Sequence, residues 1–474
     1  MKAIHIHFIG IGGTGLSAIA RLLLETGGYT VSGSDQLMSP LALDIQEAGA
    51  TVFSGHAADN VKGADIVVRS SAIPENNPEV QAAMQAGIPV KKRADFLGDF
   101  MAARVGIAVA GTHGKTTTTA MIAWILTRLE QDPSYIIGGV SKNLSNNAHA
   151  GKGDAFVIEA DEYDRMFLGL TPQVAVVTNM EHDHPDCFPT AQDYQQAFKD
   201  FVNCVRPGGL LLACQDDPGA AQLAREAPEH IRSLVYGVFE NRTLPDDLAV
   251  DYSALNLELN NIGCFQFEVW LRANGEMPQN LGVVSLQVPG KHNVSNALAA
   301  FAVVHQLGFS PAGTARALEE FVGTQRRFDV RGEVDGVTVI DDYAHHPVEI
   351  KATLCAARKR FPGQRLTAVW QPHTYSRTQM LCDAFIAAFD HADRVIVTEV
   401  YAAREISDGF SAAQIVEQMS HPAANFIASL DEVVEDLLGW VLPGDVVIVL
   451  SAGDADRVSG ELLEKIVPQE GLDG

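Results

Sequence analysis

Short apolar runs alternate with helical patterns along most of the chain. The segment AIHIHFI (3–9) alternates apolar and polar side chains as a half-buried strand does, and SAIARLLLE, which follows it, has helical spacing. Further strands are predicted at YTVSGSD, which ends at Asp35, and at ADIVVRSSAI (64–73). Strands that alternate with helices in this way favour a parallel sheet built from βα units.

The same pattern restarts twice. From Val105 a strand leads into the helix TTTTAMIAWILTRL, and AFVIEAD (155–161) and VAVVTNM (174–180) are predicted as further strands. Residues 206–290 contain short strands and turns, among them FQFEVWL and VVSLQVPG, before a helix near HNVSNALAA. A third series begins at VTVIDDYAHHP (337–347) and continues through LTAVWQPH, DRVIVTEV and GDVVIVLSAGD. The predicted fold class is α/β, with three consecutive domains: a Rossmann-like domain (1–102), a central phosphate-loop domain with a mixed sheet (103–322) and a second Rossmann-like domain (323–474).

Composition excludes several classes of function. The chain has 474 residues, too many for one ordinary core, and its 20% charged and 47% hydrophobic residues are typical of a folded globular protein. A formal net charge of -25 repels nucleic acid and anionic membranes, so we expect neither as a partner. The six cysteines form no CxxC pair, the start does not resemble a signal peptide, and no apolar run is long enough to span a membrane. A cytoplasmic protein is therefore expected.

The glycine-rich turn GIGGTG (10–15) follows the first strand and precedes a helix. Its glycines let the backbone approach a ligand closely, and a helix N-terminus attracts a diphosphate. Both a dinucleotide and a nucleotide-diphosphate sugar have that group, so the turn alone leaves the two open, and a tight turn without a ligand is the less favoured alternative. A later strand end, SSAIPENNPE, offers serine hydroxyls to a second phosphate or a sugar. The candidate residues for this site are Gly12, Gly13, Thr14, Gly15, Asp35, Ser70 and Ser71.

The stretch IAVAGTHGKTTTT (107–119) is a shortened phosphate loop. The full pattern has a glycine five positions before Gly114, where this chain has Val109, and the nearest glycine is Gly111. Backbone N–H groups of such a turn bind phosphate oxygens, Lys115 can neutralise the β and γ phosphates, and Thr116 can bind Mg²⁺ through its hydroxyl. A lysine at a helix start opposes the helix dipole, and a bound anion would explain it.

Polar clusters follow the neighbouring strands. EADEYD (159–164) and NMEHDH (179–184) contribute Glu159 and His184, which could bind a second divalent ion near the γ-phosphate. On the helix HNVSNALAA, Asn293 and Asn296 lie one turn apart, where helix capping is an equally good explanation. In RRFDVRGE, Arg326 and Arg327 stand at a domain junction, where guanidinium groups can close on phosphate or simply be solvated.

The turns DDYAHHP and QPHTYSRT end two strands of the third domain. They bring polar and cationic residues to one sheet edge, which indicates a pocket for a substrate carboxylate: Asp342, Tyr343, His345, His373 and Arg377. A diphosphate site, a phosphate loop and a cationic pocket are more than hydrolysis requires. They suit a ligase that phosphorylates a carboxylate and then lets an amine displace the phosphate.

Seven motifs resemble those of the Mur ligases and occur in the same order: GTHGKTTTT, EADEYD, TNMEHDH, HNVSNALAA, RRF, DDYAHHP and QPHTYSRT. The resemblance covers essentially the whole chain, and GIGGTGLSAIA, SGSD, SSAIPENNPE and DDYAHHP are most similar to members that join L-alanine to UDP-N-acetylmuramate. It implies an N-terminal UDP-sugar domain, a central ATPase domain and a C-terminal domain that binds the amino acid, with ATP and Mg²⁺ as cofactors. By this resemblance the ATP-binding residues are Gly111, Thr112, His113, Gly114, Lys115, Thr116, Thr117, Asn293, Asn296, Arg327, Asp342 and Tyr343. It also implies Thr116, Glu159 and His184 as metal ligands and Lys115, His184, His345, His373 and Arg377 as catalytic residues.

Two positions depart from the better-known pattern. Tyr163 stands where many members have serine, and Thr374 where many have arginine, so another basic residue such as Arg404 would compensate. Tyr163 also occurs in the members that recycle a murein tripeptide, which keeps that activity as the main alternative. An NAD-dependent dehydrogenase would leave the phosphate loop unexplained, and a nucleotide-binding regulatory protein would have no need of the third-domain pocket. The sequence leaves a monomer and a homodimer open.

Overall fold

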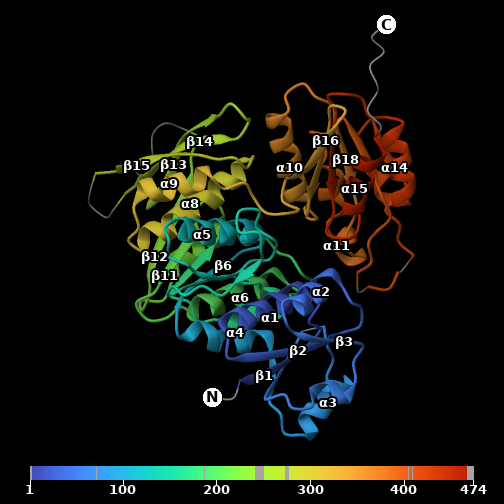
Figure 1. Ribbon diagram of the computed structural model, residues 1–474. Helices are drawn as coiled ribbons and strands as arrows, with labels where there is room; N and C mark the ends of the chain where they lie inside the picture. Colours follow the sequence, from blue (N-terminus) through green and yellow to red (C-terminus); the bar gives the residue numbers. More distant parts are fainter. Residues whose placement is uncertain are drawn as a thin grey trace. The chain divides into compact units, whose positions relative to one another are not determined.

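The computed structural model (Figure 1) describes residues 3–70, 72–185, 187–240, 250–272, 277–403, 405–407 and 409–466. The chain forms two compact units. The first contains Met1–Asn256, Glu268–Val284 and Ser295–Phe321, and the second contains Leu257–Phe267, Ser285–Val294 and Val322–Gly474. Two of the site residues considered above, Ser71 and Arg404, lie outside the described residues. No helix in the described parts of the chain is both long and apolar enough to cross a membrane.

The first sheet is parallel and confirms the predicted βα pattern. Its strand order is β3 (Thr51–Ser54), β2 (Tyr29–Asp35), β1 (Ile4–Ile9), β4 (Ile66–Arg69), β5 (Val90–Lys92). Strand β4 is shorter than predicted because the chain turns at Ser70. The helices are α1 (Thr14–Thr26), α2 (Pro40–Glu47), α3 (Pro78–Gln85) and α4 (Arg93–Ala102), with the 3₁₀ turn η1 (Ala58–Val61).

A buried polar cluster lies beneath this sheet and centres on Glu79 of α3. The Glu79 carboxylate accepts hydrogen bonds from Ser34 Oγ at 2.5 Å and from Asn60 Nδ2 at 2.5 Å. Two imidazoles also face it, His7 at 3.6 Å and His56 at 3.4 Å. Burial opposes its charge, but these hydrogen bonds outweigh burial and lower the pKa of Glu79 to about 2. The ionised carboxylate therefore belongs to the folded state.

The middle sheet is mixed, as predicted. Parallel pairing runs from β13 through β12, β11, β10, β6 and β9 to β7, which pairs antiparallel with β8. Among the described residues its strands are, in spatial order, β15 (Gln279–Ser285), β14 (Phe265–Leu271), β13 (Tyr252–Leu259), β12 (Arg232–Val238), β11 (Leu210–Cys214), β10 (Val174–Val177), β6 (Val105–Ala110), β9 (Ala155–Glu159), β7 (Ser134–Ile136) and β8 (Ala148–His149). The strand predicted at VVSLQVPG is only partly right, because β15 begins earlier and ends at Ser285. The helical segments are α5 (Lys115–Arg128), η2 (Tyr163–Gly169), α6 (Ala191–Asn203), α7 (Pro218–Arg225), α8 (Lys291–Gln306) and α9 (Pro311–Glu319).

The third sheet separates two apolar layers. Alternate residues of its strands face opposite sides: Ile448 packs with α10 (Pro347–Arg360), and Val447 and Val449 pack with α14 (Leu430–Leu438) and α15 (Asp456–Lys465). Figure 1 shows α10 on one face and α14 on the other. The strand order is β16 (Asp329–Val334), β17 (Val337–Asp342), β21 (Val446–Leu450), β18 (Leu366–Trp370), β19 (Arg394–Val397), β20 (Ala424–Phe426). The shorter helices are α11 (Tyr375–Met380), α12 (Cys382–Ile386) and α13 (Ala413–Val416).

Candidate active site

Two glycines give the phosphate loop its shape. Gly111 and Gly114 have φ of 138° and 81°, which other residues rarely adopt. A Cβ at Gly111 would lie 2.0 Å from Thr178 Oγ1, and one at Gly114 would lie 2.5 Å from Asn296 Oδ1. The loop therefore needs glycine at both places for conformation and for space. The second contact also brings Asn296, one of the predicted nucleotide residues, to the start of α5.

The turn after β10 forms hydrogen bonds with the backbone of the phosphate loop. Thr178 Oγ1 donates to the His113 carbonyl at 2.6 Å, and Asn179 Oδ1 accepts from the His113 N–H at 2.8 Å. Thr112 Oγ1 and the Glu181 backbone exchange hydrogen bonds, and His113 Nε2 lies 3.0 Å from Glu181 Oε2. The motif TNMEHDH thus holds the backbone of the phosphate loop in place.

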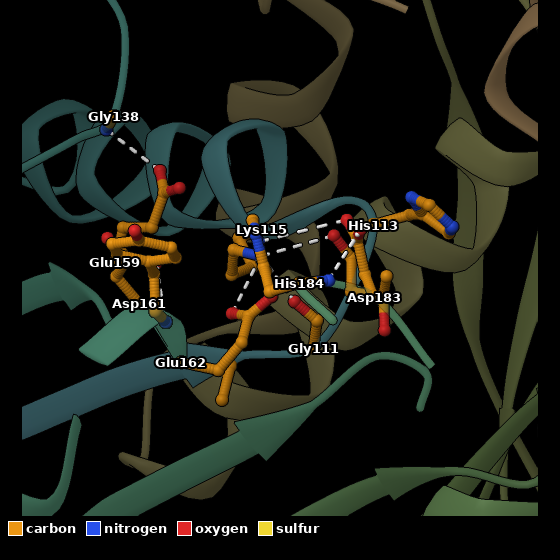
Figure 2. A network of polar contacts seen from close by, with 12 residues as sticks. Gly111, His113, Lys115, Gly138, Glu159, Asp161, Glu162, Asp183 and His184 are labelled. Atoms are coloured by element: carbon orange, nitrogen blue, oxygen red, sulfur yellow. Dashed lines mark hydrogen bonds and ion pairs between the residues drawn. The ribbon is translucent and has the colours of Figure 1, made fainter. Parts of the chain in front are cut away.

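Lys115 lies in a buried network that Figure 2 shows in close view. Its ammonium donates to the carbonyl oxygens of Gly111 at 2.6 Å and Thr112 at 3.1 Å, and to Glu162 Oε1 at 3.0 Å. Burial alone would lower the pKa of Lys115, but the carboxylates of Glu162, Glu159 and Asp161 outweigh it and raise that pKa. Lys115 is therefore charged. Its ammonium group, close to several carboxylates, lies in the loop that would bind a triphosphate.

A tyrosine of α6 connects Glu162 with the loop. Tyr194 is buried, and its hydroxyl lies 2.8 Å from Thr112 Oγ1 and 3.4 Å from Glu162 Oε1. Burial raises the pKa of Tyr194, so the phenol keeps its proton and can donate to the carboxylate. Tyr194 thereby orients both the loop threonine and the partner of Lys115.

The candidate metal ligands surround this network. Glu159 Oε2 accepts from the Gly138 N–H at 2.8 Å, which fixes the carboxylate at the end of β9. His184 has a φ of 55°, and its ring packs edge to face against Tyr163 with centroids 5.1 Å apart. Carboxylate and hydroxyl oxygens suit Mg²⁺, and Thr116, the next residue after Lys115, brings the hydroxyl to this end of α5. Thr116 and Glu159 thus offer oxygen donors of the kind that Mg²⁺ prefers, and His184 offers a ring nitrogen.

The glycine turn of the first domain is held by the predicted Asp35. The Gly12 N–H donates to Asp35 Oδ2 at 2.9 Å, and a Cβ at Gly12 would lie 3.0 Å from the same oxygen. Ser70 lies beside Gly10, where a Cβ would be 3.2 Å from its own Cβ. Helix α1 begins at Thr14. The turn, Asp35 and Ser70 are thus brought together at one end of the parallel sheet.

The third-domain residues form two adjoining groups in the second unit. Asp342 is buried and accepts from the N–H groups of Phe328 and Ala344, and burial raises its pKa. Arg327 lies over the Tyr343 ring at 5.1 Å. The rings of His345 and His373 are 5.9 Å apart, and Arg377 Nη1 lies 3.3 Å from His373 Nδ1. Asn293 also belongs to this unit, where its amide donates to the Pro289 carbonyl at 2.7 Å.

Several contacts were not predicted residue by residue. Glu162, Asn179 and Glu181 lie inside motifs that the sequence singled out, but their partners depend on how each turn folds. Tyr194 is one of the aromatic residues of an amphipathic helix, and nothing in its neighbourhood distinguishes it. In the third domain, Tyr401 stacks on His373 with centroids 5.8 Å apart.

Comparison with known proteins covers nearly all of the chain. Residues 5–105 match the Mur ligase family, catalytic domain, residues 109–304 the Mur ligase middle domain, and residues 326–453 the Mur ligase, glutamate ligase domain. The UDP-N-acetylmuramate–L-alanine ligase of Roseiflexus sp. (strain RS-1) is 42% identical over 98% of this chain and 100% of its own. The enzyme of that name from Caldanaerobacter subterraneus subsp. tengcongensis is 40% identical over 97% of both chains.

Solved structures also show similarity to Mur ligases. The UDP-N-acetylmuramate-alanine ligase MurC of Thermotoga maritima has a TM-score of 0.80 and 29% identity, over 98% of this chain and 99% of that one. A murein peptide ligase from Psychrobacter arcticus has a TM-score of 0.71 and 27% identity over the same shares. The predicted three-domain α/β fold class and the family resemblance are confirmed, and the dehydrogenase and regulatory alternatives lose their support. The chain therefore belongs to the Mur ligase family and is a ligase.

Proposed function

We propose that this chain uses ATP to join L-alanine to the lactyl carboxylate of UDP-N-acetylmuramate, a step in peptidoglycan precursor synthesis. The observation that carries the proposal is the charged Lys115, half-buried in a shortened phosphate loop and close to three carboxylates. Relatives with 40–42% identity over nearly the whole chain bear the name of that activity, which supports the choice within the family.

The chemistry proceeds in two displacements. A carboxylate oxygen of the acceptor attacks the γ-phosphorus of ATP, ADP leaves, and an acyl phosphate forms. The amine of L-alanine then attacks the acyl carbon, phosphate leaves, and an amide bond remains. Lys115 stabilises the negative charge on the transferred phosphoryl group, and Mg²⁺ would add to this by neutralising phosphate oxygens.

We assign the roles of the other site residues from the family resemblance. The loop residues 111–117 with Asn293, Asn296, Arg327, Asp342 and Tyr343 would contact ATP, and Thr116, Glu159 and His184 would hold Mg²⁺. The turn with Asp35, Ser70 and Ser71 would bind the UDP-sugar. His345, His373 and Arg377 would bind the amino-acid carboxylate and direct its amine, with Arg377 supplying the charge. The domain limits 1–102, 103–322 and 323–474 and a cytoplasmic location remain predictions.

The deciding experiment compares two amines. ATP and UDP-N-acetylmuramate are supplied with either L-alanine or the L-Ala-γ-D-Glu-diaminopimelate tripeptide, and phosphate release and product mass are measured. We expect product with L-alanine. Glycine and serine should be poorer substrates, since one methyl group distinguishes rivals by only about 1 to 3 kcal/mol. Ligation of the tripeptide without ligation of alanine would identify the recycling activity instead.

A further inference from the structure

Two cations begin helix α4. Lys92 is its N-cap and Arg93 its first residue. Positive charge at a helix N-terminus opposes the helix dipole, so it needs anionic neighbours. Carboxylates of the EADEYD motif supply them: Lys92 Nζ lies 3.7 Å from Asp164, and Arg93 Nη2 donates to Asp161 Oδ2 at 3.1 Å. The start of α4 is therefore tied to the turn that also contributes Glu159 and Glu162.

Close backbone packing fixes α4 against that turn. A Cβ at Gly98 would lie 2.2 Å from the Gly169 carbonyl oxygen, and a Cβ at Gly169 would lie 2.6 Å from the Ala94 carbonyl oxygen. The backbones of α4 and η2 thus touch with no side chain between them. The first turn of α4, which contains Arg93 and Ala94, is thereby fixed against η2.

The two terminal nitrogens of Arg93 face different sites. While Nη2 binds Asp161, Nη1 lies 2.0 Å from the position that a Cβ at Gly15 would occupy. Gly15 belongs to the first turn of α1, in the glycine-rich turn to which we assign the UDP-sugar. The Arg93 side chain is 26% exposed, so a ligand can reach it. A planar guanidinium can bind a carboxylate and a phosphate at the same time.

Asp161, the partner of Arg93, lies in the turn next to the phosphate loop. Figure 2 shows Asp161 beside Glu159 in the network around Lys115. Its Oδ1 accepts from the Tyr163 N–H at 3.1 Å, which fixes the carboxylate within the turn. The ion pair of Arg93 with Asp161 therefore lies between the glycine turn and the EADEYD turn, which also contributes Glu159 and Glu162.

We propose that Arg93 binds the diphosphate of the UDP-sugar through Nη1 while Asp161 holds Nη2. Arg93 is then a substrate-binding residue, and Asp161 is the residue that positions it. The inference rests on the proposed function, because it takes the UDP-sugar as the ligand of the glycine turn. Fixing the diphosphate relative to EADEYD would place the distant lactyl carboxylate at a reproducible position.

The test measures binding without turnover. Calorimetry of the full chain with UDP-N-acetylmuramate, in the absence of ATP, should give a Kd at least about tenfold higher for Arg93→Ala than for the unmodified protein. In steady-state assays the KM for the UDP-sugar should rise similarly, while the KM for ATP should change by less than about threefold. Arg93→Lys should recover part of the affinity, since it keeps the charge but loses the fork geometry.

Lys92→Ala is the matched control. It removes a neighbouring cation and its ion pair from the same helix start, but Lys92 is not the residue that faces Gly15. Its Kd should stay within about threefold of the unmodified value. Asp161→Asn should weaken binding less when Arg93 is already alanine, because the two residues act through one contact.

The outcomes separate the two proposals. Equal affinities for folded Arg93→Ala and the unmodified protein, or equal losses for Arg93→Ala and Lys92→Ala, would overturn the role of Arg93 and leave the ligase activity standing. If Arg93→Ala does not fold, Arg93→Lys with unchanged Kd gives the same negative answer. An unmodified protein that neither binds nor turns over UDP-N-acetylmuramate would overturn the proposed function and this inference with it.

Discussion

Lys115 Nζ lies 2.9 Å from Glu162 Oε2, and the two side chains are 13% and 1% exposed. Lys115, to which we assign the binding of phosphate, is thus paired with the buried carboxylate of Glu162. An arriving nucleotide competes with Glu162 for the same ammonium. We therefore expect Glu162→Gln to bind ADP more tightly in the absence of Mg²⁺, by about threefold or more, because one like-charge repulsion is lost.

The check on Glu162→Gln is calorimetry with ADP in a chelating buffer. Glu181→Gln is a suitable comparison, since Glu181 contacts His113 and not Lys115 through its side chain. Weaker ADP binding by Glu162→Gln would mean that the carboxylate helps to orient the lysine more than it competes with the ligand.

Lys115→Ala should lower turnover by about 10² to 10³, the usual effect of losing one preorganised charge contact. The sequence alone predicts that this variant leaves the fold intact. The structure changes that expectation, because Glu162 would remain buried without its cation, and such a loss costs about 3 to 5 kcal/mol when the charge stays ionised.

Thermal melting beside phosphate release distinguishes the two effects of Lys115→Ala. The double variant Lys115→Ala with Glu162→Gln should recover much of the stability and none of the turnover. Near-normal turnover in either variant would remove the phosphate loop from the mechanism. Lys62→Ala, at an exposed position of the first domain, serves as the control for loss of a lysine.

Tyr163→Ser should weaken the binding of Mg²⁺ without abolishing activity. The edge-to-face contact of Tyr163 with His184 is worth about 0.5 to 1.5 kcal/mol, and its loss frees the histidine ring. The Mg²⁺ concentration for half-maximal turnover should therefore rise by less than about tenfold, and by more in His184→Ala. An unchanged Mg²⁺ requirement in Tyr163→Ser would separate Tyr163 from the metal site.

Glu79 should make the first domain sensitive to acid. Its pKa falls from the usual 4.5 to about 2 in the folded state, so its stabilisation is complete above about pH 4.5 and disappears as the pH falls toward 2. A shift of that size corresponds to about 3 kcal/mol. Glu79→Gln should lower the melting temperature near neutral pH and flatten its decline below pH about 4.5.

The control for Glu79 is Glu75→Gln, which changes a largely exposed carboxylate in the same domain. Melting curves between neutral and acidic pH compare the two variants. Parallel pH profiles for Glu79→Gln and the unmodified protein would show that other groups govern acid unfolding.

The sequence predicted the elements and the loop because both are local. Alternating apolar residues specify β1, and a strand, two glycines and a lysine specify the start of α5. The carboxylate that pairs with Lys115 could not be predicted from the sequence. EADEYD offers four acidic residues, and the choice of Glu162 depends on the turn that follows, in which Asp164 and Arg165 have φ of 52° and 53°. Arg93 and Tyr194 reach the site from α4 and α6, so their roles arise from packing and leave no signal in the sequence nearby.

The strand order of the third sheet has a consequence for synthesis on the ribosome. Strand β21 is the last strand among the residues that the structure describes, yet it pairs with β17 on one side and β18 on the other. The first sheet uses residues up to Lys92 and can assemble while translation continues. The third sheet cannot be completed until Val446–Leu450 have left the exit tunnel. Until then, the edges of β17 and β18 that pair with β21 stay exposed. A premature stop codon before Val446 would therefore remove the centre of that sheet and leave two apolar edges open to chaperones and proteases.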